Sequence, residues 1–289
     1  MQDVLLKATI EGGIRMYILS AQNVVEKARV LHNCSSLAIS ALGRTLMGGL
    51  LLAATMKNDE AITIKISGDG PLGDIVVDAC GGNVRGYVDN TTIELPLTAD
   101  GKPAVAEAVG PTNGNITVRR FNKDKQPFTG ICNLACGEIA EDITRYLYVS
   151  EQTPSSVALG VCIDTDSTVK HAGGFLIQPM PEADENSLII LEENITNFAG
   201  INNSLTNGKT LEEIIQTIAG PLKVNLYETI PLQFICQCSH ERILDMFSSL
   251  GKKELYELSQ DANTEVVCHF CNKKYLLSTE ELKNLADSL

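Results

Sequence analysis

Apolar and polar residues alternate over many short stretches in the first two-thirds of the chain, a pattern typical of half-buried β-strands. Glycine-containing turns separate several of these stretches, which favours antiparallel hairpins and meanders, with Gly12-Gly13 in the first turn. The predicted strands are 3–10, 14–20, 61–67, 74–80, 84–88, 115–121, 127–134, 157–163 and 174–178.

A different pattern, apolar on nearly every side, follows a predicted helix at 22–33 and extends to about Met56. Its uninterrupted apolar part is about half of the ~20 residues that a membrane span requires. Arg44 would lie near the middle of a membrane at a cost of several kcal/mol. We therefore predict a helix buried in a protein core, capped by Ser35 or Ser36.

The pattern changes again after Pro179-Met180-Pro181, where a short acidic stretch precedes helical spacing from 187 to 227. Gly200 and Asn207-Gly208 interrupt this spacing, and Thr210 with Glu213 forms a capping-box pattern. A further helix is expected at 137–149. The predicted organisation is an α+β N-terminal domain at 1–181, a helical linker at 182–231 and a cysteine-containing module at 232–289.

Charge and cysteine content narrow the possible partners and compartment. The 289 residues carry a net charge of −13, which argues against nucleic-acid partners and anionic membranes, because both are bound through clustered Lys and Arg. The N-terminus lacks the features of a secretory signal peptide. Nine cysteines in such a chain indicate reduced thiols and a cytoplasmic location.

Two close cysteine pairs in the last module carry the strongest chemical signal. Cys236 and Cys238 are separated from Cys268 and Cys271 by 29 residues, a spacing that predicts one tetrahedral site for a single Zn²⁺ ion. Metal ligation would also help to fold so short a segment, since structural zinc contributes about 10–16 kcal/mol in small modules. His240 and His269 lie beside the pairs, but four thiolates already complete the coordination.

The spacing leaves the role of this site open. A permanent structural zinc would make the protein a constitutive scaffold or adaptor. A redox switch would lose its metal when the thiolates are oxidised. A thiol–disulfide oxidoreductase acting through Cys268 and Cys271 would need one exposed, metal-free thiol, which the second pair opposes.

Six stretches of the chain match a known family. Two contain the cysteine pairs, CQCSHER at 236–242 and CHFCNKKYLLSTEEL at 268–282. Four lie earlier, KISGDGPLGDIVVDA at 65–79, NVRGYV at 83–88, SEQTPSSVALGV at 150–161 and AGGFLIQPMP at 172–181. The sequence thereby resembles the heat-shock protein 33 family of redox-regulated bacterial chaperones: the first two stretches are similar to the family's zinc module and the other four to its N-terminal domain.

This resemblance implies an α+β domain whose sheets enclose a buried helix, which would bind clients and dimerise. It also implies a non-enzymatic holdase that is inactive when reduced and zinc-bound. Oxidative stress would form the disulfides Cys236–Cys238 and Cys268–Cys271, expel zinc and unfold the linker. Homodimers would then hold unfolding proteins without ATP. This mechanism does not require the five other cysteines, which we expect to be buried thiols: Cys34, Cys80, Cys132, Cys136 and Cys162.

Overall fold

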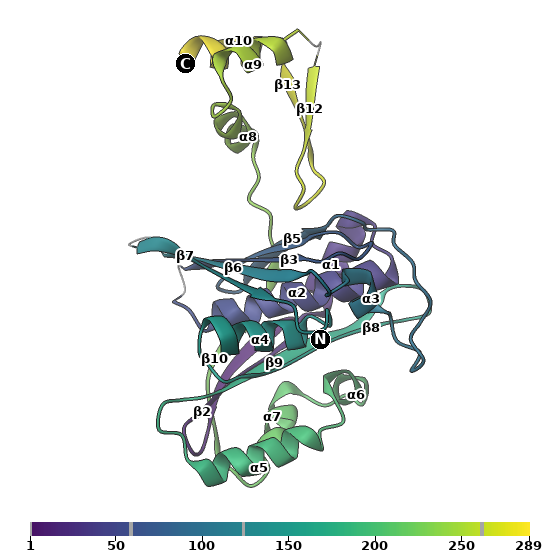
Figure 1. Cartoon of the computed structure of the whole chain (residues 1–289), viewed down its shortest axis with the longest axis vertical. Helices are drawn as coiled ribbons and strands as arrows, with labels where there is room; N and C mark the ends of the chain where they lie inside the picture. The colour runs from purple at the N-terminus through teal and green to yellow at the C-terminus, as the bar shows by residue number, and fades with distance from the viewer. Residues whose placement is uncertain (1, 58–59, 123–124, 261–262) are drawn as a thin grey trace. The chain divides into compact units, whose positions relative to one another are not determined.

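The computed structural model describes residues 2–57, 60–122, 125–260 and 263–289 and has the predicted mixed α+β architecture (Figure 1). The chain divides into two compact units, Met1–Phe234 and Ile235–Leu289. The larger unit contains two sheets with helices between them and on one outer face. The smaller unit contains a two-stranded sheet and three helices within its described residues.

Two sheets organise the larger unit. The five-stranded sheet has the order β10-β1-β2-β9-β8 and the six-stranded sheet has the order β11-β5-β4-β3-β6-β7. The predicted β1–β2 hairpin, the β3–β4–β5 meander and the β6–β7 hairpin all form with antiparallel pairing. Their strands are β1 (Val4–Ile10), β2 (Ile14–Ser20), β3 (Ala61–Ser67), β4 (Ile75–Cys80), β5 (Asn83–Val88), β6 (Asn115–Asn122), β7 (Lys125–Asn133), β8 (Ser156–Ile163) and β9 (Val169–Pro179).

Helix α2 (Ser36–Ala54) is the predicted apolar helix, and it is buried in the core of this unit. It packs against β4 and β5 of one sheet and against β8 and β9 of the other. Ser35 caps it by accepting a hydrogen bond from the backbone N–H of Ala38 at 3.2 Å. The helix is long and apolar enough to cross a membrane, but 94% of its most apolar window is buried inside the protein. The prediction of a core helix is therefore confirmed.

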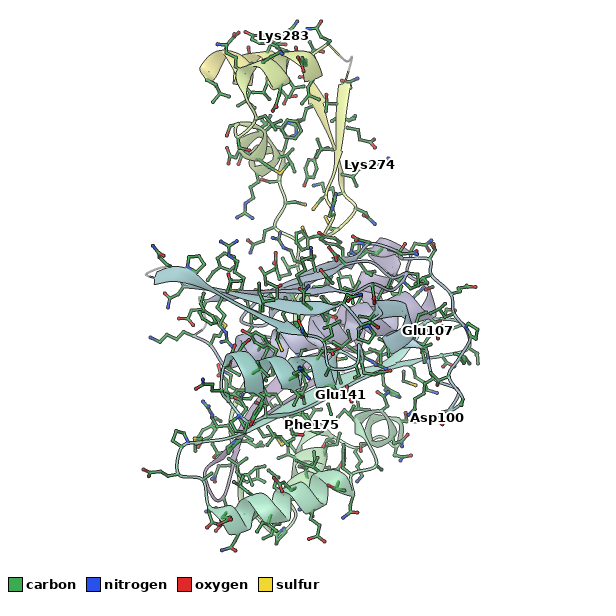
Figure 2. The ribbon with its side chains drawn as sticks, in the orientation of Figure 1. Asp100, Glu107, Glu141, Phe175, Lys274 and Lys283 are labelled. Atoms are coloured by element: carbon green, nitrogen blue, oxygen red, sulfur yellow. The ribbon has the colours of Figure 1, made fainter. Side chains whose placement is uncertain are left out.

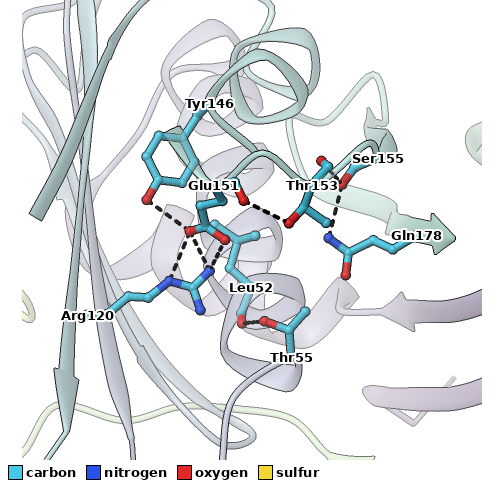
Figure 3. A network of polar contacts seen from close by, with 8 residues as sticks. All are labelled: Leu52, Thr55, Arg120, Tyr146, Glu151, Thr153, Ser155 and Gln178. Carbon is cyan, nitrogen blue, oxygen red and sulfur yellow. Dashed lines mark hydrogen bonds and ion pairs between the residues drawn. The ribbon is translucent and has the colours of Figure 1, made fainter. Parts of the chain in front are cut away.

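Three further helices, α1 (Gln22–His32), α3 (Val105–Val109) and α4 (Ala140–Ser150), surround α2. Next to α4, a chain of polar contacts connects the two sheets (Figure 3). Arg120 of β6 and Tyr146 of α4 both donate to the Glu151 carboxylate, at 2.6 and 2.9 Å. The chain continues through Thr153 and Ser155 to the side chain of Gln178 on β9.

Helices α5 (Glu185–Thr196), α6 (Ile201–Thr206) and α7 (Leu211–Ala219) form the helical part of the predicted linker. Together with β1, β2 and β9 they bury a second apolar core, separate from the one around α2. Phe175 of β9, labelled in Figure 2, belongs to this core. Its ring contacts the Phe198 ring edge-on, with ring centroids 6.0 Å apart. The linker helices thus cover one apolar face of the five-stranded sheet.

The prediction of helical structure up to residue 227 was wrong at its C-terminal end. Residues from Val224 to Pro231 form strand β10, which pairs antiparallel with β1 at the edge of the five-stranded sheet. Gly220 ends α7 with φ of 60°, and Pro221 lacks the N–H needed to continue a helix. Without β10, the outer edge of β1 would have no backbone partner in this sheet.

A short anchor follows β10. Strand β11 (Gln233–Phe234) pairs in parallel with β5, and the side chains of Leu232 and Phe234 are 5% and 3% exposed. Lys27 Nζ donates to the Phe234 carbonyl at 2.9 Å. The larger unit therefore holds the chain firmly up to two residues before Cys236.

The smaller unit contains α8 (His240–Phe247), α9 (Lys252–Leu258), β12 (Asn263–Val267), β13 (Lys274–Ser278) and α10 (Thr279–Ser288). A capping box begins α10: Ser278 Oγ accepts from the Glu281 N–H, and the Glu281 carboxylate accepts from the Ser278 N–H. Six buried residues make up its core: Ile243, Leu255, Tyr275, Leu277, Leu282 and Ala286. So small a core leaves room for a metal to contribute to folding.

Candidate metal centre

The Sγ atoms of the four predicted ligands, Cys236, Cys238, Cys268 and Cys271, all lie within 4.8 Å of one another. Cys236 Sγ is 3.7 Å from Cys268 Sγ, and Cys238 Sγ is 3.4 Å from Cys271 Sγ. Zn–S bonds of about 2.3 Å in a tetrahedron place sulfur atoms about 3.8 Å apart. The four thiols therefore fit a tetrahedral zinc ion in number, chemistry and spacing.

Local backbone structure positions the two cysteine pairs. Cys236 and Cys238 lie in the irregular segment that ends at α8, where Ser239 caps the helix by accepting from the Arg242 N–H at 3.2 Å. Cys268 and Cys271 lie in the turn between β12 and β13. The Cys268 carbonyl accepts from the Cys271 and Asn272 N–H groups at 3.3 and 2.8 Å. Asn272, with φ of 56°, then turns the chain back into β13.

Hydrogen bonding makes the four thiols electrostatically unequal. Tyr275 Oη donates to Cys238 Sγ at 3.1 Å. Burial opposes ionisation of Cys238, but the hydrogen bonds from Tyr275 and from the other three thiols outweigh it and lower the Cys238 pKa to about 7. Burial raises the pKa of Cys268 and of Cys271, and hydrogen bonds to neighbouring thiols raise both further. Cys238 is thus the member of the cluster in which thiolate is favoured.

The two neighbouring histidines are not part of the cluster. His240 Nε2 lies 2.7 Å from Glu281 Oε1. The backbone and hydroxyl of Ser278, and then His240, lower the pKa of Glu281 to about 2. His269 is exposed. Among the residues that the structure describes, the four cysteines form the one group with metal-ligand geometry.

The five other cysteines lie outside this cluster, and none of them forms a disulfide within the described residues. Cys34 and Cys132 are buried, as expected, and burial raises the Cys34 pKa to about 12. Cys80, Cys136 and Cys162 are only partly buried, so the expectation of full burial was wrong for them.

The cysteine spacing does not indicate Tyr275 as part of the site. Its contact with Cys238 joins residues 37 positions apart and depends on how the β12–β13 hairpin is oriented against the segment before α8. The sequence signal that was available is its position in β13, where inward and outward side chains alternate.

Comparison with known proteins places the chain in a family. The family model described as "Hsp33 protein" matches residues 3–278. The chain is 43% identical to a 33 kDa chaperonin of Enterococcus faecalis, covering 99% of this chain and 97% of that one. It is 40% identical to a 33 kDa chaperonin of Bacillus cytotoxicus, with both covered completely.

A solved structure agrees with these matches. The crystal structure of a 33 kDa chaperonin from Thermotoga maritima, described as a heat shock protein 33 homologue, superposes with a TM-score of 0.90. It is 35% identical and covers 99% of this chain and 98% of its own. By its sequence, its fold and the extent of both matches, the chain belongs to the Hsp33 family.

Proposed function

We propose that this protein is a redox-regulated, ATP-independent holdase chaperone of the bacterial cytoplasm. The observation that carries the proposal is the four-thiol cluster, in a chain similar over nearly its whole length to proteins named 33 kDa chaperonin. It is inactive while Cys236, Cys238, Cys268 and Cys271 hold one Zn²⁺ ion. Activation follows their oxidation under oxidative stress, and no catalytic turnover of a substrate is involved.

In the reduced protein, the zinc site would link two segments of the smaller unit. Zinc bound by the four thiolates would tie the β12–β13 turn to the segment before α8. Because only six residues form the buried core of this unit, ligation would supply much of its folding free energy.

Oxidation of the thiolates would break this zinc-mediated link. A thiolate attacks the O–O bond of a peroxide, which forms a sulfenic acid and releases hydroxide. The second thiolate of the pair then attacks that sulfur, so that an S–S bond forms, the S–O bond breaks and a second hydroxide leaves. Formation of each disulfide, Cys236–Cys238 or Cys268–Cys271, thus transfers two electrons from a pair of thiolates to one peroxide. Oxidation removes the thiolate charges that would bind the metal.

The larger unit offers the apolar surface that a holdase needs. Helices α5, α6 and α7 cover a sheet face that carries Ile14, Met16, Ile18 and Phe175. Unfolding of these linker helices would expose this face to the apolar segments of unfolding client proteins. We propose that the oxidised form acts as a homodimer. The net charge of −13 disfavours nucleic acid and anionic membranes as partners.

The test is to treat reduced, zinc-loaded protein with hydrogen peroxide at raised temperature. Zinc release is followed with a colorimetric chelator, and aggregation of an unfolding client by light scattering. We expect both zinc release and suppression of aggregation, and peptide mapping should find the two disulfides within the pairs. All four sulfurs are mutual neighbours in the reduced site, so distances alone do not select the pairing.

Cys236→Ser should lower the zinc affinity and alter activation, whereas the matched control Cys162→Ser changes a thiol outside the cluster and should leave both unchanged. Zinc release without any gain of anti-aggregation activity would refute the chaperone proposal. Retention of zinc under peroxide would favour a constitutive structural-zinc scaffold.

A further inference from the structure

Tyr275 is not one of the four ligands, but its side chain contacts one of them. Its hydroxyl group donates a hydrogen bond to Cys238 Sγ at 3.1 Å, while the residue is only 6% exposed. Strand pairing with Val266 fixes its backbone. Its ring also lies beside two neighbours, with Lys273 Nζ 5.1 Å from its centroid and the His240 ring centroid 6.3 Å away. These contacts position the ring so that its hydroxyl lies beside Cys238 Sγ.

A hydrogen bond of this kind changes what a thiolate can do. Sulfur reacts with peroxides and alkylating agents through a lone pair, and a donor directed at the sulfur stabilises its negative charge. In the zinc-loaded protein all four sulfurs would already be thiolates, so the hydrogen bond would leave the thiolate fraction unchanged. It would only make the Cys238 thiolate a weaker nucleophile. Groups that hydrogen-bond to metal ligands tune the ligands in the same way and also orient them.

We propose that Tyr275 is a positioning residue that restrains the nucleophilicity of Cys238 and so raises the oxidant level needed to modify it. The inference rests on the proposed function, because it concerns regulation of the same site. The step affected is attack of the Cys238 sulfur on a peroxide: an S–O bond forms, the O–O bond breaks and hydroxide leaves.

The structure offers a matched pair of variants. Tyr275→Phe removes the hydroxyl and keeps the ring in the core. Tyr256→Phe removes a hydroxyl in the same unit that donates instead to the Asp287 carboxylate. Each reduced, zinc-loaded full-length protein is treated with iodoacetamide, and alkylation of each cysteine is followed by peptide mass spectrometry.

We expect Tyr275→Phe to accelerate alkylation of Cys238 on the order of threefold or more, with little change at Cys271. Tyr256→Phe should match the unmodified protein. Trapping of sulfenic acid with dimedone after peroxide treatment should show the same selective increase at Cys238. An unchanged Cys238 rate, or an equal increase at all four cysteines, would overturn the proposal, since the latter indicates general loosening of the unit.

A second substitution covers the case in which Tyr275→Phe fails to fold or to load zinc. Site-specific 3-fluorotyrosine at position 275 keeps the ring and makes its hydroxyl a stronger donor, so Cys238 should react more slowly. A faster or unchanged rate would count against the proposal. Alkylation requires no chaperone activity, so failure of the proposed function in the peroxide assay is distinguishable from failure of this inference.

Discussion

Asp142 illustrates how a single residue can stabilise an irregular segment of this fold. Its side chain is fully buried, and Oδ1 accepts from the backbone N–H groups of Ala135, Cys136 and Gly137 at 2.7–3.1 Å. Its other oxygen accepts from the Ile139 N–H at 2.9 Å. One carboxylate thus satisfies four backbone donors just before and at the start of α4.

The same segment contains backbone strain. Ile139 has φ of 69° and ψ of −52°, and the Ala140 N–H donates to the Glu138 carbonyl at 2.8 Å, which closes a γ-turn. A β-branched residue rarely adopts a positive φ. The hydrogen bonds to Asp142 and the burial of the Ile139 side chain hold the turn in place.

Asp142→Ala should lower the free energy of unfolding of the larger unit by about 3 kcal/mol or more, because it leaves buried N–H groups without an acceptor. Urea denaturation followed by circular dichroism measures the change. Glu141→Ala, at an exposed neighbour on the same helix, is the control and should change stability by less than about 0.5 kcal/mol. Similar stabilities for the two variants would contradict this account.

At the scale of elements, β10 and β11 connect the linker helices to the metal module through the body of the larger unit. Strand β10 completes one sheet and β11 joins the other, so the segment just before Cys236 is tied to both. Leu232 lies between the two strands and donates its N–H to the Asp3 carbonyl at 3.0 Å. The linker therefore does not lead directly into the cysteine module.

Phe234→Ala tests this anchor. The loss of a buried aromatic side chain should destabilise the larger unit by about 3–5 kcal/mol. Zinc stoichiometry should stay unchanged, because no cysteine ligand is altered. Leu226→Ala, at a half-exposed position of β10, is the control and should be nearly neutral. Urea unfolding and zinc analysis on the same samples provide the measurements, and loss of zinc at unchanged stability would disprove the assignment.

At the scale of the whole molecule, the two units differ in how they are stabilised. Two extensive apolar clusters support residues 1–234, and one of them encloses α2. Among its described residues, the unit of residues 235–289 has one small apolar cluster, which includes Leu255 and Leu277. Metal removal should therefore affect the two units unequally.

We expect chelation of zinc under reducing conditions to abolish amide hydrogen-exchange protection in β12, β13 and α10, because zinc ligation, if the proposed function holds, would supply much of that unit's folding free energy. Protection of α2 should persist. Mass spectrometry of peptides before and after chelation measures both regions. Retained protection in β12 and β13 would show that the small core suffices by itself, and loss of protection in α2 would show that the units do not fold independently.

Several features could be predicted from the sequence because they depend on local pattern. The all-round apolarity of 36–54 predicts a buried helix, and alternation with glycine turns predicts the β1–β2, β3–β4 and β4–β5 pairings. The two cysteine pairs predict that their four thiols come together. The capping boxes at Thr210 and Ser278 also follow from residues three positions apart. In each case the deciding interactions lie close together in the chain, or the residue type allows few alternatives.

Other features were decided by tertiary structure alone. Residues from Val224 to Pro231 became a strand because β1 has an open edge more than 200 positions away, which no local pattern reports. Tyr275 finds its partner only after the β12–β13 hairpin has packed, since a thiol 37 positions away carries no sequence signature. The sequence by itself determined which residues can bind a metal. Tertiary structure determined which neighbours touch them, because hydrogen bonds depend on distances that only the folded chain sets.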